Sequence, residues 1–451
     1  MLPDPYPVRP WTCPCRGEVS LPGSKSLTNR ALVLAAIGRG PVLLKNALFS
    51  RDSRLLVDNL DRLGFPVEAD EERETIRIEG MEGRIPVARA ELEVGNAGTA
   101  ARFLTALVCL HSAGHYRIDG DMEMRERPMK GLIEALERAG ARFRFHERPY
   151  HFPLSVSTAG LQGGDWRVEA AASSQMFSAL MMVAPHARDP VAIRASRARP
   201  AFVRMTEMLM RRFGAEIDGS PERGYRILPA GEMRPSPECL PIEPDATAAS
   251  YFMALPKTTG GSLLIRGLEE GMLQGDTAFA GVLSDLGMVR QTVPQGWKIH
   301  WNETPGGGPR TFSFETFSDT FLTLAAVAPL FPWPLTLSGI GHTRFQETDR
   351  IAAMAEGLRL AGARVDTQED RMTIHPWKRD EKRDEGCSVL INTYKDHRVA
   401  MSFAVAGSFD RYGDGRPWLS LADPACCGKT FPGFFSRLEE LYLNAHDEKS
   451  K

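Results

Sequence analysis

The chain has 451 residues, of which 43% are hydrophobic and 25% are charged, and it contains 41 glycines. This composition is typical of a globular α/β or α+β protein with two or three domains, and it excludes a fibrous repeat or a disordered chain. A formal net charge of −2 excludes a globally basic nucleic-acid binder, so any anion site must be local.

The N-terminal segment and the cysteines narrow the class further. The first 20 residues lack the apolar core of a secretory signal, and no apolar stretch reaches the roughly 18 residues that a transmembrane helix needs. We therefore expect a cytoplasmic protein. The seven cysteines have no paired CxxC spacing, which indicates neither a disulfide framework nor a zinc site. Cys13 and Cys15 are expected to be free thiols in an N-terminal extension.

Six segments repeat one pattern, in which polar or small residues precede a run rich in Ala, Leu and Met. In chain order they are GSKSLTNRALVLAAI, NAGTAARFLTALV, SSQMFSALMMVA, DATAASYFMALP, SDTFLTLAAVAPL and DHRVAMSFAVAG. With Ser26, Gly98, Ser174, Thr247, Asp319 and His397 as markers, the repeats start 72 to 78 residues apart. Each unit also offers a second, amphipathic helix, such as KGLIEALERAGARF or RIAAMAEGLRLAGARV. This pattern predicts six β-α-β-α-β units, which are too long for the common solenoid repeats.

The apolar helices are nearly uniform around their circumference, which predicts that they are buried. A helix start exposes unpaired N–H groups and a partial positive charge, so several starts that face one cleft would bind an anion. Ser, Thr, Asp and Asn are also ordinary N-caps, so each of them alone has a structural explanation. Lys25, Arg30, His397 and Arg398 are cations at helix starts and oppose the helix dipole unless an anion is present, which favours a ligand site.

The first repeat, GSKSLT, contains the clearest local signal. It is not a Walker A loop, because Lys25 follows a serine and no glycine stands four residues before an adjacent Gly-Lys pair. A lysine flanked by hydroxyl groups, with Arg30 one turn later, suits phosphate or carboxylate. The alternative is a solvated surface lysine.

Seven segments together form a more specific signature. They are LPGSKSLTNRALVLAA, NAGTAARFLTAL, RERPM, SSQMFSALMM, RFQETDRIAAMAEGL, KDHRVAMSFAVAG and GKTFPGFF, between about Gly23 and Phe435. This combination resembles the EPSP synthases, the 3-phosphoshikimate 1-carboxyvinyltransferases. The resemblance implies an α/β (α+β) enolpyruvyl transferase fold of two domains, each with three βαβαββ-type units around buried parallel helices. It places residues 1–21 and 244–451 in the first domain and 22–243 in the second, with the active site in the interdomain cleft.

The resemblance also implies a reaction. The family transfers the enolpyruvyl group of phosphoenolpyruvate to the 5-hydroxyl of shikimate 3-phosphate by addition and elimination, on the shikimate pathway to chorismate and the aromatic amino acids. No metal or organic cofactor takes part. We therefore expect two small-molecule substrates, no nucleic-acid or membrane partner, and a monomer. The phosphates and carboxylates of the substrates need a dense set of cations.

By correspondence with the family motifs, each role falls on particular residues. Phosphoenolpyruvate would be bound by Lys25, Gly98, Arg127, Gln175, Arg350, Arg398 and Lys429. Shikimate 3-phosphate would be bound by Lys25, Ser26, Arg30, Ser173, Ser174, Gln175, Asp319 and Gln346. Asp319 would accept the proton of the attacking hydroxyl, and Glu347 with Lys25 would handle protons at the methylene carbon. Asn96, Thr99 and His397 would support these groups.

Several of these residues have simpler local explanations. Asp319 can be an N-cap, and Glu347 can be a first-turn acid that pairs with Arg350 at i,i+3. A lone histidine such as His397 is usually structural, and a lysine after glycine, such as Lys429, is commonly solvated. The local pattern leaves these alternatives open.

The chain departs from the family on the acceptor side. Gln346 stands where a lysine is common, and Ala198 and Ala201 lie in a stretch that commonly reads serine-lysine-proline-tyrosine. His342 replaces a frequent asparagine. Arg197, Arg199 and Arg344 are candidates for replacing the lost charge. Acceptor affinity is therefore left open.

A further departure bears on glyphosate, the inhibitor of the family. Gly98 is unsubstituted, which favours sensitivity, whereas Phe103 replaces a common proline on the same helix. Sensitivity to glyphosate is left open.

Two other functions compete with this interpretation. The sister enolpyruvyl transferase that acts on UDP-N-acetylglucosamine has a loop cysteine near the position of DMEMRERPM, but no cysteine lies between Cys109 and Cys239 here. A noncatalytic phosphometabolite-binding protein would keep the cations, but it would gain nothing from Asp319 and Glu347.

Overall fold

The computed structural model describes residues 2–168, 174–195, 200–230, 233, 239–302, 307–377 and 388–447. The chain divides into two compact units. Unit 1 comprises Met1–Pro22 and Pro244–Lys451, and unit 2 comprises Gly23–Glu243. The N-terminal extension therefore belongs to the unit that contains the C-terminal half of the chain.

Each unit contains three small sheets. In unit 2 the sheets run in the order β14-β3-β5-β4, β6-β7-β9-β8 and β10-β11-β13-β12. The strands are β3 Arg39–Lys45, β4 Val67–Asp70, β5 Thr75–Met81, β14 Cys239–Pro241, β6 Arg89–Glu93, β7 His115–Asp119, β8 Arg142–Phe145, β9 Leu154–Ser157, β10 Gly164–Val168, β11 Val191–Ala195, β12 Ile217–Ser220 and β13 Gly224–Ile227.

The sheets of unit 1 have the orders β16-β17-β15-β2, β18-β19-β21-β20 and β1-β23-β22. The strands are β1 Tyr6–Val8, β2 Glu18–Val19, β15 Ser262–Arg266, β16 Met288–Val293, β17 Gly296–Trp301, β18 Arg310–Ser313, β19 Leu335–Ser338, β20 Val365–Thr367, β21 Arg371–Ile374, β22 Val389–Ile391 and β23 Leu419–Leu421. Every four-stranded sheet joins one parallel pair to two antiparallel pairs. The predicted sixfold repeat is confirmed, and in the described residues its last sheet has three strands.

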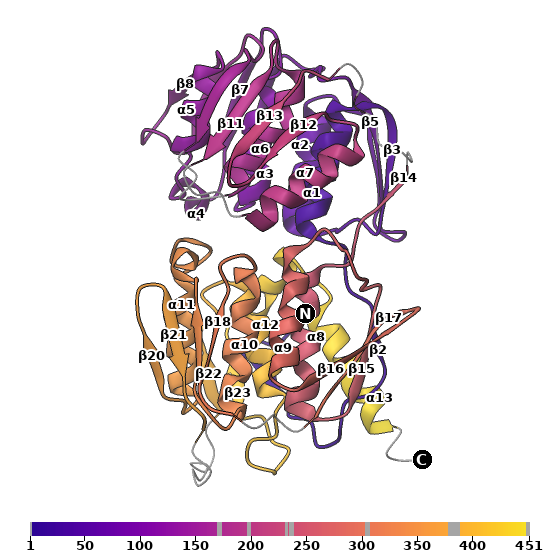
Figure 1. Cartoon of the computed structure of the whole chain (residues 1–451), viewed down its shortest axis with the longest axis vertical. Helices are drawn as coiled ribbons and strands as arrows, with labels where there is room; N and C mark the ends of the chain where they lie inside the picture. Colours follow the sequence, from indigo (N-terminus) through magenta and orange to yellow (C-terminus); the bar gives the residue numbers. More distant parts are fainter. Residues whose placement is uncertain are drawn as a thin grey trace. The chain divides into compact units, whose positions relative to one another are not determined.

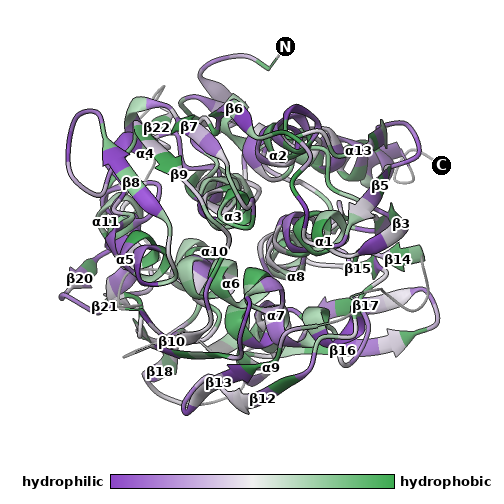
Figure 2. Ribbon diagram, turned by 90° about the horizontal axis from the view of Figure 1, so that it is seen from above, coloured by the Kyte–Doolittle hydropathy of each residue, from purple (hydrophilic) through white to green (hydrophobic). Residues whose placement is uncertain are grey.

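Six apolar helices form the cores. They are α1 Lys25–Ile37, α3 Gly98–Val108 and α6 Ser174–Val183 in unit 2, and α8 Ala246–Thr259, α10 Phe321–Val327 and α12 His397–Gly407 in unit 1. Within each unit the three helices pack against one another, with the sheets outside them (Figure 1). All residues of α3 and residues 27–37 of α1 are buried, as their uniform apolar composition predicted. Figure 2 shows green along α1, α3, α6, α8 and α10 and more purple on outer strands such as β8.

The second helix of each repeat lies nearer the surface and is amphipathic. These helices are α2 Arg51–Arg62, α5 Lys130–Arg138, α7 Pro200–Arg212, α9 Phe279–Asp285, α11 Arg350–Leu360 and α13 Phe434–Asp447, and a short helix α4 spans Met122–Arg125. Their polar faces remain exposed while one apolar stripe packs inward. In α5, for example, Leu132, Ile133 and Leu136 are buried, whereas Lys130 and Glu137 are exposed.

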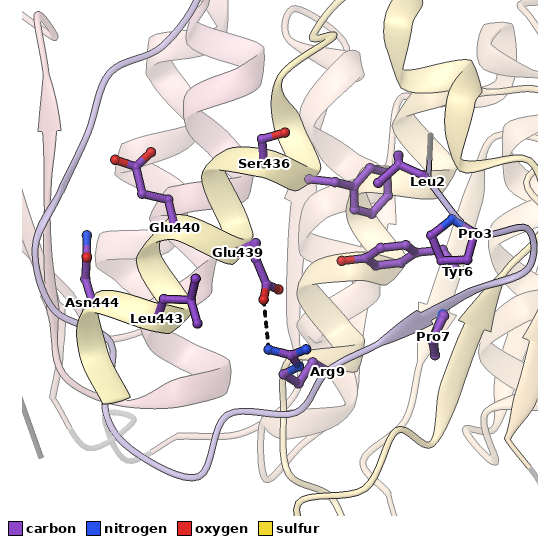
Figure 3. A pocket seen from close by; sticks show the side chains of 11 residues that line it. Leu2, Pro3, Tyr6, Pro7, Arg9, Ser436, Glu439, Glu440, Leu443 and Asn444 are labelled. Atoms are coloured by element: carbon purple, nitrogen blue, oxygen red, sulfur yellow. Dashed lines mark hydrogen bonds and ion pairs between the residues drawn. The ribbon is translucent and has the colours of Figure 1, made fainter. Parts of the chain in front are cut away.

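The N-terminal extension is attached to α13. Figure 3 shows Arg9 donating to Glu439, with Nη1 and Oε1 2.8 Å apart, beside a cavity of about 630 Å³. None of the predicted site residues lines this cavity. Cys13 and Cys15 are free thiols, as predicted, and they hydrogen-bond the carbonyl oxygens of Ala445 and Gly260. Their role in this structure is to tie the extension to the unit.

The described residues contain neither a membrane-spanning helix nor a metal-binding cluster. None of their helices is long and apolar enough to cross a membrane. Within the same part of the chain, no group of three or more His, Cys, Asp or Glu side chains is arranged to hold a metal ion.

Candidate active site

Arg350 is the centre of a buried ionic cluster in unit 1. It is the first residue of α11 and is 1% exposed. Its Nε lies 2.7 Å from Asp396, its Nη1 3.0 Å from Asp319 and its Nη2 2.9 Å from Glu347. Asp396 caps α12, and Asp319 lies in the 3-10 turn η3 (Ser318–Thr320) that precedes α10. Three helix starts of unit 1 therefore meet at one guanidinium group.

The cluster extends to two further cations. Arg398 donates from Nη2 to Asp319 at 2.8 Å, and Lys429 donates from Nζ to Glu347 at 2.9 Å. Lys429 ends the 3-10 segment η6 (Pro424–Lys429). The charges thus alternate in the order Arg398, Asp319, Arg350, Glu347, Lys429. Each predicted acid lies between two of the predicted cations.

The carboxylates keep both arginines charged despite their burial. Burial alone would lower the pKa of Arg350, but the charges of Asp396, Glu347 and Asp319 raise it above its ordinary value. Burial would likewise lower the pKa of Arg398, but Asp319, together with smaller contributions from neighbouring acidic groups, raises it above its ordinary value. Two permanent cations are therefore held in place beside the two predicted acids.

The local alternatives for these residues are now distinguished. Asp319 does not occupy an N-cap position, because Phe317 precedes η3 and Thr320 precedes α10 as their caps. Its carboxylate instead bridges Arg350 and Arg398. Glu347 does pair with Arg350 at i,i+3. It also accepts a hydrogen bond from Lys429, which lies 82 residues further along the chain. The side chain of Lys429 is 13% exposed, so this lysine is not simply solvated. His397 starts α12, is buried and lies beside Asp396.

Two of the residues that depart from the family sequence, Gln346 and His342, form hydrogen bonds within unit 1. Gln346 accepts a hydrogen bond from Nη1 of Arg350, and His342 pairs with the hydroxyl of Ser318 at 2.8 Å. Arg344 donates to Asp349 and to the carbonyl oxygens of Glu369 and Gln368. Because its donors are already used, these contacts argue against Arg344 replacing the positive charge that Gln346 lacks. Ala201 lies in the first turn of α7. Ser173, Arg197, Ala198 and Arg199 lie outside the described residues.

In unit 2, Lys25 and Ser26 begin α1. Lys25 donates from Nζ to Asp52 at 3.2 Å, and both side chains are largely buried. Asp52 lies in the first turn of α2, so this carboxylate fixes the direction of the lysine. Ser24, at the N-cap position, makes no side-chain capping bond.

Arg30, one turn into α1, is buried among uncharged acceptors. It donates to the hydroxyls of Thr206 and Ser178 and to the carbonyl oxygen of Ser26, at 2.7, 3.2 and 2.9 Å. The ring of Phe103 packs against the guanidinium group at 5.4 Å. Within the described parts of the chain Arg30 makes no ion pair, and burial lowers its pKa to about 9. A buried cation without a counter-charge is costly unless an anion binds beside it.

Gly98 marks a second meeting point in unit 2. A methyl group added there would lie 2.8 Å from Nη1 of both Arg102 and Arg127, and 3.5 Å from Oε1 of Gln175. Gly98 is the first residue of α3 and Gln175 the second residue of α6, so two helix starts and two guanidinium groups converge. The predicted set of Gly98, Arg127 and Gln175 is thus brought together.

Two of the three predicted supporting residues, Asn96 and Thr99, lie at the start of α3, and the third, His397, begins α12 in unit 1. Asn96 and Thr99 flank Gly98, and Thr99 and Ser174 are buried at the starts of α3 and α6.

Sequence reasoning missed four residues that the structure places among these groups: Asp52, Arg102, Asp276 and Asp396. Asp396 stands directly before His397 in DHRVAM, so its capping role could have been predicted. Arg102 lies four residues after Gly98, one helical turn away, which was a usable signal. Nothing local identifies Asp52 or Asp276.

Comparisons with known proteins give a consistent result. The family model described as EPSP synthase (3-phosphoshikimate 1-carboxyvinyltransferase) matches residues 12–438. A 3-phosphoshikimate 1-carboxyvinyltransferase of Opitutus terrae is 48% identical over 445 residues, which cover 98% of each chain. One from Nostoc punctiforme is 36% identical and covers 95% of this chain and 97% of its own.

A solved structure supports the fold independently of sequence. The EPSP synthase of Acinetobacter baumannii superimposes with a TM-score of 0.78 at 20% identity, covering 96% of this chain and 97% of its own. At that identity the likeness shows a shared fold, and the predicted enolpyruvyl transferase architecture is confirmed.

Proposed function

Because the chain belongs to the EPSP synthase family, we infer that it transfers the enolpyruvyl group of phosphoenolpyruvate to the 5-hydroxyl of shikimate 3-phosphate, releasing inorganic phosphate. The observation that carries this inference is the full-length match at 48% identity to a curated enzyme of this activity. The paired acids and cations of unit 1 support a catalyst rather than a passive binding protein.

We propose that Arg350, Arg398 and Lys429 bind phosphoenolpyruvate, together with Lys25, Gly98, Arg127 and Gln175 of unit 2. The three cations of unit 1 are already ordered by carboxylates, so little side-chain freedom is lost when the anion binds. Gly98 supports the proposal because an added methyl would crowd the guanidinium groups there.

Asp319 and Glu347 are proposed to move the protons. In the addition step, Asp319 takes the proton of the 5-hydroxyl, the oxygen attacks C2 of phosphoenolpyruvate, and the methylene carbon gains a proton. Glu347 and Lys25 are the candidates for that proton transfer. In the elimination step the resulting methyl group loses a proton, the double bond re-forms and phosphate departs. Arg350 contacts both acids and would hold their carboxyl groups in place during both steps.

Shikimate 3-phosphate is proposed to bind through Lys25, Ser26, Arg30, Ser173, Ser174 and Gln175, with Asp319 and Gln346 on the side of unit 1. The uncharged surroundings of Arg30 support this role, since an anionic substrate would supply the missing counter-charge. Gln346 keeps a polar group where the family commonly has a cation, which predicts weaker acceptor binding than in lysine-containing relatives.

The decisive experiment is an acceptor assay. The purified protein is incubated with phosphoenolpyruvate and either shikimate 3-phosphate or UDP-N-acetylglucosamine, and released phosphate is measured. We expect release only with shikimate 3-phosphate. Phosphate release with UDP-N-acetylglucosamine but not with shikimate 3-phosphate would favour the sister transferase. Substrate binding without phosphate release in the presence of either acceptor would favour a noncatalytic protein.

The family resemblance also predicts that both units contribute to one site, as a monomeric cytoplasmic enzyme. X-ray scattering with and without both substrates tests this, because substrates that bridge two units should reduce the radius of gyration. An unchanged radius at saturating substrate would count against a shared site. Mass spectrometry of the native protein gives the oligomeric state.

A further inference from the structure

Asp276 is a buried acid that the proposed mechanism does not use. It lies in the 3-10 turn η2 (Gly275–Ala278), which packs against α8, α9 and η3, and it is 5% exposed. Its neighbour Gln274 fixes the turn to the start of α8, accepting from the amide of Ala246 at 3.0 Å and donating to the carbonyl of Pro244 at 2.7 Å. The carboxyl group is therefore held rigidly at a helix start of unit 1.

One oxygen of Asp276 suits a protonated acid. Its Oδ1 is buried and has no hydrogen-bond partner in the described part of the chain. The hydrogen bond with the hydroxyl of Thr247 acts the other way and lowers the pKa, but its effect is smaller than that of burial. A buried carboxylate oxygen without a donor is costly when the group is ionised and much less so when it is neutral.

The two nearby carboxylates also raise the pKa of Asp276, and one nearby arginine lowers it. Three charged side chains act on the carboxyl group of Asp276. They are Asp245, the cap of α8, Asp319 of η3 and Arg398 of α12. The neighbouring helix α9 contributes apolar side chains, Phe279 and Ala280. Burial first, and then the charge of Asp319, raises the pKa of Asp276 to about 7, and Arg398 only partly opposes this.

We propose that Asp276 is a positioning residue that carries a proton when phosphoenolpyruvate binds, so that it does not compete with the incoming anion for the charge of Arg398. This inference rests on the proposed function. When Asp276 ionises, a further negative charge acts on Arg398 besides those of Asp319 and Asp245, and less of that cation's attraction is left for an incoming anion.

The sign of the pH effect follows from this arrangement. Below pH 7 Asp276 is neutral and the donor side of unit 1 has its full positive charge. As the pH rises through about 7 the group ionises, so the KM for phosphoenolpyruvate should increase. Binding of the anion should in turn favour the protonated form, so binding above pH 7 should take up a proton from solution.

The test compares Asp276→Asn with the wild-type protein between pH 6 and 8.5. Asn has the shape of the protonated acid, keeps an oxygen for Thr247 and cannot ionise. We expect the KM of the wild type to rise roughly tenfold more than that of the variant across this range. The phosphate of the substrate titrates identically in both, so the ratio of the two KM values isolates Asp276.

The control is Asp285→Asn, which removes an exposed acid at the end of α9 and should follow the wild type. Identical pH dependence in the wild type and Asp276→Asn would overturn the proposal, because a purely structural role predicts only a uniform loss. No phosphate release from any protein at any pH would instead contradict the proposed function.

If the Asp276→Asn variant fails to fold, a measurement on the wild-type protein alone still tests the proposal. Calorimetric binding of phosphoenolpyruvate at pH 8, in two buffers of different ionisation enthalpy, counts the protons exchanged. The substrate phosphate is almost fully ionised there, since its second pKa is about 6. We expect net proton uptake; zero uptake or proton release would refute the proposal.

Discussion

Two buried arginines at helix starts show how differently one residue type is used in the two units. Arg350 in unit 1 is surrounded by Asp319, Glu347 and Asp396, which raise its pKa above the ordinary value. Arg30 in unit 2 has only hydroxyl and carbonyl partners, and burial lowers its pKa to about 9. The charge of Arg350 therefore stabilises the folded protein through its three carboxylate partners. The charge of Arg30 destabilises the folded protein until an anion binds beside it. The contrast predicts that removing Arg350 costs far more folding stability than removing Arg30.

The largest effect is expected at the acid that touches Arg350. Asp319→Asn should lower kcat by roughly 100-fold to 10,000-fold, because Asn cannot accept the proton of the hydroxyl. Substrate affinity, measured by calorimetry, should change far less. Glu356→Gln is the matched control, since Glu356 is an exposed acid on α11 that pairs with Tyr394. Equal losses of binding and turnover in Asp319→Asn would contradict its role as the base.

Arg350→Met should lower the free energy of unfolding by about 3–5 kcal/mol, because it leaves three carboxylates buried without their shared cation. Denaturant unfolding monitored by circular dichroism measures this loss. A change below about 1 kcal/mol would show that the ionic cluster does not depend on Arg350.

Arg30→Met sharpens the contrast, since it should change the free energy of unfolding by less than about 1 kcal/mol. The hydroxyls of Thr206 and Ser178 already hydrogen-bond each other at 2.8 Å, so the substitution leaves them paired. The KM for shikimate 3-phosphate should rise about 10-fold to 100-fold with the loss of a charge-assisted hydrogen bond. A destabilisation as large as that of Arg350→Met would erase the distinction between the two arginines.

Gly98→Ala should have the smallest effect, an increase of about tenfold in the KM for phosphoenolpyruvate with kcat largely kept. The added methyl would displace the guanidinium groups of Arg102 and Arg127 from the start of α3. Gly281→Ala on α9 is the control, because nothing lies within 4 Å of its added methyl. Parallel inhibition curves for glyphosate with wild type and Gly98→Ala would settle the sensitivity that Gly98 and Phe103 leave open.

Much of the site was predictable because its signals are local. The polar starts of the six apolar helices, and the i,i+3 spacing of Glu347 and Arg350, depend on residues within one or two turns. The partner of Lys429 lies 82 residues away and that of Lys25 lies 27 away, so neither pairing has a periodic signature in the sequence. Asp276 was missed for the same reason.

The sequence by itself determined that six buried helices begin with polar residues and that the family motifs occur in order, because hydrophobic periodicity and motif spacing are properties of the chain. Only the tertiary structure decided which of those polar residues pair. Asp396 and Asp319 reach Arg350 because three helix starts pack together, whereas Arg30 meets Thr206 and Ser178 because α1 packs against both α6 and α7. Electrostatic partners are chosen by packing over tens of residues, and that choice sets both the charge state and the stability of each group.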